Sequence, residues 1–279
     1  MAGEVTSKPV TLIRPTKGWI PIDVRELWEN RELLYFLVWR NLKVRYKQTI
    51  LGVAWSILQP ALAMLVFTFL FGQLAGVPCG ATPYPICVYT ALLPWNLFAV
   101  SLTSASISLV ANENIITKVY FPRVLLPLAA VLTGFVDFAI AFSVLIALMV
   151  YFGVVPTISI AFLPLFVSLV LVCATGISLW LSALDAKYRD VRHTLPFLAQ
   201  LWFFATPVVY SLSLIPKGLH WFYSLNPMVG VTEGFKWSLL GEAFVFEPSI
   251  GLSLVIGVAI FLGGIFYFRR AERTLADVV

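Results

Sequence analysis

Long apolar runs alternate with short charged segments from residue 50 to the C-terminus. Six runs are long enough to cross a hydrocarbon core, which needs about 20 helical residues. They cover residues 50–72, 84–111, 124–152, 158–184, 194–215 and 249–268. The prolines at 60, 94, 127, 164, 196 and 207 fall within these runs and should kink or break them locally, which packed membrane helices tolerate where neighbours satisfy the freed carbonyls. The pattern predicts an all-α integral membrane protein whose six transmembrane helices occupy a domain of residues 49–279.

The segment before the first run divides into two parts. Residues 1–21 contain three prolines and little periodicity, which predicts a flexible N-terminal arm. Within residues 22–48, Asp23 and Glu26 have the spacing of a capping box, and apolar residues recur at helical spacing at Val24, Leu27, Trp28, Leu34 and Tyr35. We expect an amphipathic interface helix that ends in the basic stretch 39–47. A solvated charged helix without a membrane contact is the alternative.

A long mixed segment, residues 216–248, separates the fifth and sixth runs. It contains two apolar pieces, 219–225 and 228–240, and each is too short to span a bilayer. Non-helical backbone at membrane depth must line protein or water. We therefore predict two re-entrant helices that form an outer gate, with a globular cap on the outer surface as the alternative.

Composition and charge agree with a membrane protein and orient it. The chain is 60% hydrophobic and 12% charged, whereas soluble domains carry roughly 25% charged residues. All but two of the 19 Lys and Arg residues lie before the first run, in the loops near 112–123 and 185–193, or after residue 268; the exceptions are Lys217 and Lys236. The positive-inside rule then places both termini in the cytoplasm. Basic residues there face anionic headgroups, so nucleic acid is not an expected partner.

Few residues in the sequence carry catalytic or metal chemistry. The three cysteines and two histidines lack metal-ligand spacing, which argues against a metal site. Cys79 and Cys87 could form a disulfide in an oxidising compartment, but we favour unpaired cysteines that pack as small apolar side chains. No G-x-x-x-x-G-K-[ST] motif or catalytic Ser, His and Asp set occurs. We expect a protein that is not an enzyme and holds no cofactor.

Several short motifs follow one another along the chain: Arg45-Tyr46-Lys47, Leu51-Gly52, Trp55, Pro60, Lys118, Phe121-Pro122-Arg123, Tyr188-Arg189-Asp190, Pro207-Val208-Val209-Tyr210 and Asn226-Pro227. With these motifs the chain resembles the transmembrane permease subunit of type-2 ABC exporters, in the branch that exports bacterial polysaccharides such as O-antigen, capsule or teichoic acid. The resemblance covers nearly the whole chain and is more specific for the exporter type than for the cargo.

The resemblance implies several partners. Two copies of the permease would assemble with a separate nucleotide-binding ATPase, which uses ATP and Mg, in the bacterial cytoplasmic (inner) membrane. The cargo would be a lipid-linked polysaccharide. Two alternatives stay open at this point: a drug or small-lipid ABC exporter, and an ion- or proton-coupled secondary transporter or membrane enzyme.

The same resemblance assigns the cytoplasmic loop 112–123 as a coupling helix that docks in a groove of the ATPase. Its candidate contact residues are Glu113, Ile116, Lys118, Val119, Tyr120, Phe121, Pro122 and Arg123. A second, smaller contact is expected at Tyr188, Arg189 and Asp190. The alternative for the first segment is an ordinary basic loop without a partner. The alternative for the second is a cluster of charges at a helix end.

Aromatic residues are candidates for the substrate pathway, because sugar C–H faces stack on aromatic rings without the strong binding that would stall transport. The candidates are Phe67, Phe71, Trp202, Phe203, Phe204, Tyr210, Trp221 and Trp237. The competing explanation is the aromatic belt that anchors membrane proteins at the interfaces.

Asp137 is the one formal charge inside the six runs. A carboxylate at that depth is a functional-site hypothesis by default. Thr133 stands one turn earlier as a possible hydrogen-bond donor, and no Lys or Arg falls at comparable depth in any run. We therefore predict no ion pair within one permease and a neutral hydrogen-bonding or packing role for Asp137. A proton-coupled carrier would instead need this group to cycle its charge.

Overall fold

Helices make up all the regular structure in the residues that the computed structural model describes, 24–47, 51–79, 82–241 and 248–278. This confirms the predicted all-α class. The predicted N-terminal arm and the capping residue Asp23 lie outside the described residues. The helices are α1 (Val24–Glu29), α2 (Arg31–Lys47), α3 (Ala54–Phe67), η1 (Thr68–Leu74), α4 (Tyr84–Ser106), η2 (Val110–Asn112), α5 (Glu113–Ile116), α6 (Leu125–Phe152), η3 (Ile158–Phe162), α7 (Leu163–Lys187), α8 (Val191–Phe204), η4 (Leu212–Leu214), η5 (Lys217–Leu219), α9 (His220–Ser224), α10 (Pro227–Leu240) and α11 (Pro248–Val278).

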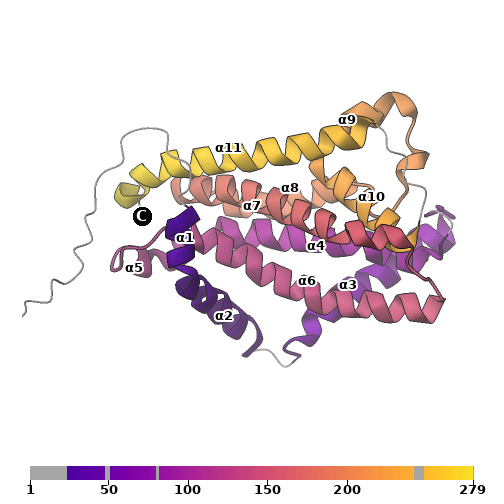
Figure 1. The fold of residues 1–279 in the computed structure, drawn as a ribbon, viewed down its shortest axis with the longest axis horizontal. Helices are drawn as coiled ribbons and strands as arrows, with labels where there is room; N and C mark the ends of the chain where they lie inside the picture. Colours follow the sequence, from indigo (N-terminus) through magenta and orange to yellow (C-terminus); the bar gives the residue numbers. More distant parts are fainter. Residues whose placement is uncertain (1–23, 48–50, 80–81, 242–247, 279) are drawn as a thin grey trace, which may run out of the picture.

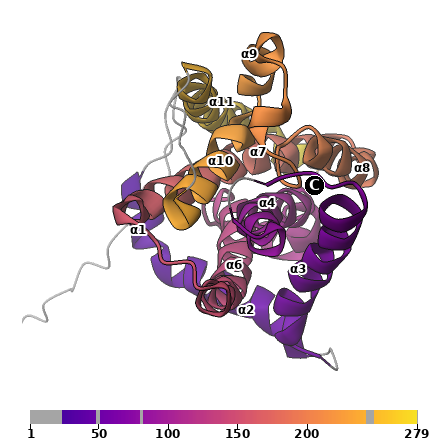
Figure 2. The ribbon, with the colours of Figure 1, turned by 90° about the vertical axis from the view of Figure 1, so that its right-hand side faces the viewer.

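Five helices in the described ranges are long and apolar enough to cross a membrane: Ala54–Leu74, Tyr84–Ser106, Leu125–Phe152, Ile158–Lys187 and Gly251–Glu272. They match five of the six predicted runs. α4 occupies the centre, with α3, α6, α7, α8 and α10 around it (Figure 2). Its residues 86–93 are almost completely inaccessible and form the middle of the main hydrophobic core.

The fifth predicted run is a broken helix. α8 ends at Phe204, and residues 205–211 continue without regular structure as a strap that includes the buried residues Thr206, Pro207, Val208 and Val209. Proline disfavours helical backbone at the residue before it and removes a backbone donor, which explains the end of the helix here. The local break expected at Pro207 is therefore the end of α8, and the second half of the run 194–215 is not α-helical.

The segment between the strap and α11 contains the two short helices expected from the sequence. α9 and α10 correspond to the apolar pieces 219–225 and 228–240. The Asn226 side chain accepts a hydrogen bond from the amide of Met228 and so caps α10, and Gly241 ends the helix with a left-handed φ of +67°. Almost every residue of α10 is buried, against α4, α7 and α11.

The amphipathic segment folds as α1 and α2, and α2 packs along α6 (Figure 1). Leu37 is buried, and Leu27, Leu33, Leu34 and Val38 pack beside it, whereas Trp28 and Tyr35 are exposed. The segment is thus helical, in two pieces, and its contact with a membrane surface stays a prediction.

Small residues let α7 and α11 approach closely. A Cβ atom on Gly264 would lie 2.2 Å from the carbonyl oxygen of Gly176, and one on Gly176 would lie 2.5 Å from Cα of Phe261. Both distances are shorter than any tolerated contact, so this crossing requires glycine. Close packing through small residues is the usual way in which membrane helices associate.

The two ends of the bundle differ in chemistry. One end, here called the basic end, carries α1, α5 and the last turns of α11 (Figure 1). Arg40, Arg123, Arg192 and Arg269 lie there and make polar contacts with neighbouring segments. The opposite end, here called the disulfide end, carries α9, α10 and a disulfide between Cys79 and Cys87.

Candidate functional site

The loop predicted to bind an ATPase lies at the basic end and divides into exposed and buried parts. α5 is a single turn, and Ile115 and Ile116 pack in a second hydrophobic cluster with Leu37 and Phe121. After this turn the chain exposes Val119 and Tyr120, whose side chains are 57% and 76% accessible. Two adjacent exposed apolar side chains on a loop are typical of a protein contact.

The last three candidates in this loop contact the permease itself. Phe121 and Pro122 are buried in the second cluster region, and Arg123 donates from Nη1 to the carbonyl oxygen of Glu272 at 3.2 Å. These residues hold the loop on the bundle and on the end of α11. Of the predicted contact residues, Glu113, Lys118, Val119 and Tyr120 are exposed to a partner, and Ile116 is partly buried.

Further polar contacts tie this loop to α2 and α11. Arg40 donates to Oδ1 of Asn112 at 2.7 Å, and the Asn112 amide donates to the carbonyl oxygen of Ser108 at 2.7 Å. Arg269 contacts Glu272 at 3.2 Å and Glu26 at 3.8 Å. The loop is thus joined directly to α2 and α11, and α11 is joined in turn to α1.

The second predicted contact, residues 188–190, is an exposed turn between α7 and α8. Its two sides are joined by Asp185 and Arg192, which form a two-bonded ion pair at 3.2 and 3.1 Å. Asp185 is fully buried, so the pair fixes the geometry of the turn. Tyr188, Arg189 and Asp190 themselves are exposed, as a docking surface requires.

Several of the predicted pathway aromatics form one cluster between α3, α4 and α8. The rings of Phe67 and Phe203 stack with centroids 5.4 Å apart, and Phe67 also contacts Phe71 at 6.0 Å. Phe203 continues to Trp95 at 5.6 Å. Phe203 is buried in this arrangement, so its ring packs the bundle, and Phe67 and Phe71 are only partly exposed.

The other pathway candidates occupy different surroundings. Trp202 packs edge-on against Phe98 and donates to Oδ1 of Asn226 at 2.9 Å, while Phe204 is half exposed. Trp221 is exposed on α9. Trp237 packs on Phe162 of η3, so it does not belong to the α3–α8 cluster.

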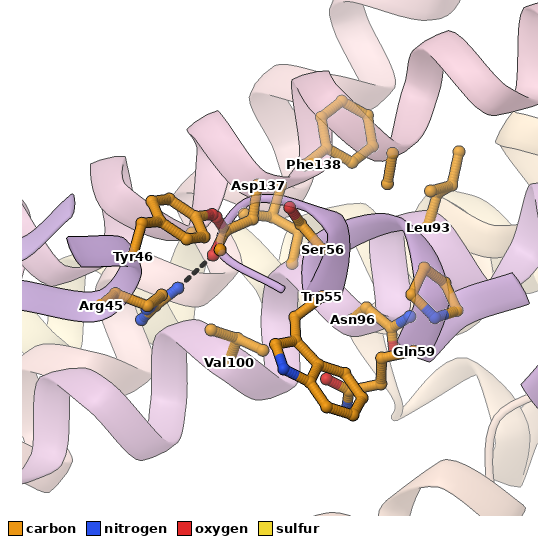
Figure 3. A pocket seen from close by; sticks show the side chains of 15 residues that line it. Arg45, Tyr46, Trp55, Ser56, Gln59, Leu93, Asn96, Val100, Asp137 and Phe138 are labelled. Carbon is orange, nitrogen blue, oxygen red and sulfur yellow. Dashed lines mark hydrogen bonds and ion pairs between the residues drawn. The ribbon is translucent and has the colours of Figure 1, made fainter. Parts of the chain in front are cut away.

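A polar site that the sequence reasoning missed lies where α2 meets α6. Arg45 donates from Nη1 to Oδ2 of Asp137, and the Tyr46 hydroxyl donates to Oδ1 of the same carboxylate (Figure 3). Arg45 also donates to Oγ of Ser104 at 3.4 Å. The Arg45 and Asp137 side chains are 34% and 19% exposed, because both border a cavity of about 330 Å³.

Two expectations about Asp137 are thus wrong. Its cation is Arg45, which lies outside the apolar runs in sequence but reaches the middle of α6 because α2 runs along that helix. Thr133, the expected donor, instead donates to the carbonyl oxygen of Ala129 at 2.7 Å. The motif Arg45-Tyr46 was the available signal, since a basic and a phenolic donor stand together where the chain enters the first span.

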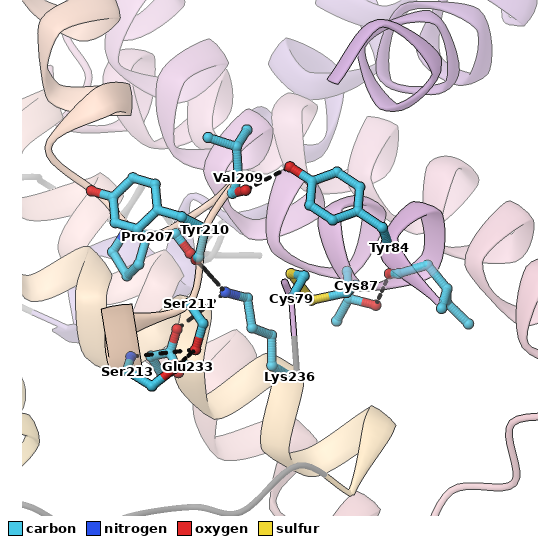
Figure 4. Close-up of a disulfide and its surroundings, with 12 residues drawn as sticks. Cys79, Tyr84, Cys87, Pro207, Val209, Tyr210, Ser211, Ser213, Glu233 and Lys236 are labelled. Carbon is cyan, nitrogen blue, oxygen red and sulfur yellow. Dashed lines mark hydrogen bonds and ion pairs between the residues drawn. A yellow bond between two sulfur atoms is a disulfide. The ribbon is translucent and has the colours of Figure 1, made fainter. Parts of the chain in front are cut away.

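At the disulfide end, the preference for unpaired cysteines is also wrong. Cys79 and Cys87 form a disulfide that joins the loop after η1 to the first turn of α4 (Figure 4). Beside it, the Tyr84 hydroxyl donates to the carbonyl oxygen of Val209 in the strap at 2.6 Å. The third cysteine, Cys173, is buried and free, and the described ranges contain no group of three potential metal-ligating side chains.

Lys236 of α10 satisfies the carbonyls of the strap. Its ammonium group donates to the carbonyl oxygens of Pro207 at 2.8 Å and Tyr210 at 3.1 Å, and to Glu233 at 3.1 Å, while the side chain is only 1% exposed (Figure 4). The Asn226 amide adds a bond to Oγ1 of Thr206 at 2.8 Å. These bonds replace the helical ones that the strap gives up, as irregular backbone in a membrane requires.

Comparisons with known proteins agree over most of the chain. The family described as ABC-2 type transporter matches residues 32–240. The O-antigen export system permease protein RfbA of Myxococcus xanthus is 32% identical over 255 residues, which cover 89% of this chain and 96% of the relative. The protein of the same name from Klebsiella pneumoniae is 27% identical over 249 residues, 89% and 95% of the two chains. The polysialic acid transport protein KpsM of Escherichia coli is 24% identical over 249 residues, 85% and 93% of the two chains.

Proposed function

This chain belongs to the ABC-2 type transporter family, and from that premise we propose that it is the membrane-spanning permease of an ATP-driven exporter of polysaccharide. The observation that carries the proposal is the near full-length match to relatives named as permeases for O-antigen export and as a polysialic acid transport protein. We further propose that the cargo is a lipid-linked polysaccharide of the O-antigen kind.

ATP hydrolysis is assigned to a partner ATPase, which would use ATP and Mg, and the permease itself would hold neither. The exposed pair Val119 and Tyr120, together with the exposed turn at Tyr188, supports this division because both surfaces lie at the basic end and are open to a second protein. Exposed loop residues held by a rigid scaffold are typical contact points.

The exporter is proposed to contain two copies of this permease. Exposed aromatic and aliphatic side chains along α3, η1 and α8, including Leu65, Phe69 and Phe204, would then face either lipid or the second copy. An aromatic-lined passage between the copies would let sugar rings stack weakly while they move.

The orientation rests on two independent features. The basic end would face the cytoplasm by the positive-inside rule, with both termini there. A disulfide persists in an oxidising compartment, so Cys79 and Cys87 would face the outer side of the cytoplasmic (inner) membrane. Both features assign the same direction, and α9, α10 and the strap then form the outer gate.

Deletion and complementation in the native host test the function. We expect a strain without this gene to lose surface polysaccharide and to accumulate it inside the cell, and the wild-type gene to restore export. An ATPase should co-purify with the permease. Unchanged surface polysaccharide in the deletion strain, accompanied by a new drug sensitivity, would favour a drug exporter instead.

A further inference from the structure

The cavity beside Asp137 has the chemistry of a binding site. It lies between α2, α3, α4 and α6 and measures about 330 Å³, at the lower end of the roughly 300–1,000 Å³ typical of small-ligand pockets. Leu93, Leu97 and Val100 form its apolar wall. Polar groups approach from two sides, with Arg45, Tyr46 and Asp137 on one and Gln59 and Asn96 on the other (Figure 3).

Two of these polar groups lack a protein partner. Among the residues that the structure describes, the side-chain amides of Gln59 and Asn96 make no hydrogen bond, while both line the cavity. Asn96 lies within a helix that is apolar enough to cross a membrane. An amide at that depth without a hydrogen bond costs free energy, and polar side chains inside membranes usually serve a function. The two amides are therefore available to a ligand.

The charges in the cavity select against a charged ligand. Arg45 and Asp137 neutralise each other, so the lining carries no net charge. A phosphate would gain the attraction of Arg45 and lose it to the repulsion of Asp137. A neutral molecule that both donates and accepts hydrogen bonds would instead find acceptors and donors in Asp137, Gln59 and Asn96.

Trp55 adds a flat apolar surface at the edge of the same cavity. Its side chain is 48% exposed and belongs to the first turn of α3, next to Gln59 (Figure 3). Aromatic faces bind C–H groups, and amides and carboxylates bind hydroxyls. One wall of this kind and several hydrogen-bonding groups opposite it match the two faces of a sugar ring.

We propose that this cavity binds one uncharged sugar unit of the exported polysaccharide, an assignment that rests on the proposed function. Trp55 covers the apolar face of the ring, and Gln59 and Asn96 bind its hydroxyls. The ion pair of Arg45 and Asp137, fixed by Tyr46, keeps the charge balanced and offers the carboxylate as an acceptor. The site would hold a unit of the cargo beside α2 before the chain enters the passage.

Site-specific photocrosslinking in cells tests this assignment. The photoreactive amino acid p-benzoylphenylalanine is placed at position 55, which keeps an aromatic ring there, and separately at position 204 in the proposed passage. After irradiation the permease is purified and probed with antibody against the surface polysaccharide. We expect an adduct at position 55, and its yield should fall roughly fivefold for each hydrogen bond removed by Asn96→Leu or Gln59→Leu.

Gln73→Leu is the matched control, since it makes the same chemical change at an exposed glutamine of η1 outside the cavity. It should leave the adduct at position 55 unchanged, and none of the three substitutions should change the adduct at position 204. Gln59 is also exposed, so Gln59→Leu tests the site even where Asn96→Leu lowers the amount of folded protein.

The remaining outcomes separate the two proposals. An adduct at 55 that contains only phospholipid, or that is insensitive to both leucine substitutions while position 204 crosslinks polysaccharide, overturns the sugar site and leaves the exporter function intact. Absence of polysaccharide adducts at both positions, in a host whose surface polysaccharide survives deletion of the gene, overturns the exporter function and the sugar site with it.

Discussion

At the residue scale, the contact between Arg45, Tyr46 and Asp137 shows what a linear reading cannot supply. The sequence identifies Asp137 as unusual, but the depth of Arg45 depends on the path of α2 along α6, which is a tertiary property. Burial, followed by the hydrogen bond to Asp137, raises the pKa of Tyr46 above its ordinary value of 10.0. Tyr46 therefore remains a neutral donor at physiological pH and holds the carboxylate together with Arg45.

The ion pair should be visible as coupling between two substitutions. Arg45→Gln and Asp137→Asn each remove one partner and leave the other partly buried, so each should destabilise the protein by about 1–2 kcal/mol, less than a fully buried pair because both side chains retain some exposure. The double variant should lose less free energy of unfolding than the sum of the losses in the two single variants. Thermal unfolding of the four purified proteins measures the cycle, and additive effects would show that the contact contributes nothing.

The neighbouring residues Tyr120 and Phe121 should separate coupling from folding. Tyr120 is exposed and Phe121 is buried, so we expect that only Tyr120 can be replaced without loss of the fold. Tyr120→Ala should change stability by at most about 0.5 kcal/mol yet uncouple ATP hydrolysis from export. Phe121→Ala should cost about 3–5 kcal/mol and lower the amount of permease in the membrane.

ATPase activity, surface polysaccharide and membrane levels of the two variants check this division. Normal export by Tyr120→Ala would remove the coupling assignment from this loop. Unchanged membrane levels for Phe121→Ala would show that its burial matters less than the packing implies.

At the element scale, apolar periodicity predicted the five long helices and the short α9 and α10, because long runs of apolar residues leave helix as the sole way to satisfy the backbone in a membrane. A kink or break at Pro207 was predicted, but the complete end of the helix there was not. Its cause is Pro207 in combination with Lys236, which follows far along the chain and satisfies the freed carbonyls. A single proline can either kink a helix or end it. Here Lys236 stabilises the non-helical backbone after α8 by its hydrogen bonds, so the helix ends.

The disulfide joins two elements, the loop after η1 and the start of α4, so its removal tests how firmly this end is held. Closing a short loop of this kind stabilises a protein by about 2–3 kcal/mol in the chain-entropy view. Replacement of Cys79 and Cys87 by Ser should lower the melting temperature of the purified permease by several degrees. A reductant should lower the melting temperature of the wild type to that of the variant and leave the melting temperature of the variant unchanged. An equal change in both proteins would contradict the disulfide.

At the scale of the whole molecule, the connections require a sixth crossing of the bundle. α7 ends at the basic end and α11 begins at the disulfide end, so the intervening chain must pass from one to the other. It does so through α8, whose 14 residues rise about 21 Å, and then through the strap. This stretch corresponds to the fifth predicted run, and α8 by itself is shorter than the about 20 helical residues that a hydrocarbon core needs.

Labelling with a membrane-impermeant maleimide tests the orientation of this arrangement. The native chain suits the experiment, because two cysteines are paired and Cys173 is buried. Leu225→Cys, exposed between α9 and α10, should react in spheroplasts, whereas Tyr120→Cys should react only after the membrane is permeabilised. The reverse pattern would invert the topology and the coupling assignment with it.

The strap has a consequence for biosynthesis. Its carbonyl at Pro207 is satisfied by Lys236, which is 29 residues further along the chain. At roughly 5–20 residues per second, a ribosome adds that stretch about 1.5–6 s after the proline. During this interval the newly made crossing carries peptide groups without their final partners, so α8 cannot settle as a finished span when it leaves the ribosome. The insertion machinery, or the water-filled side of its channel, must shelter the strap until α10 has been synthesised and folds back against it.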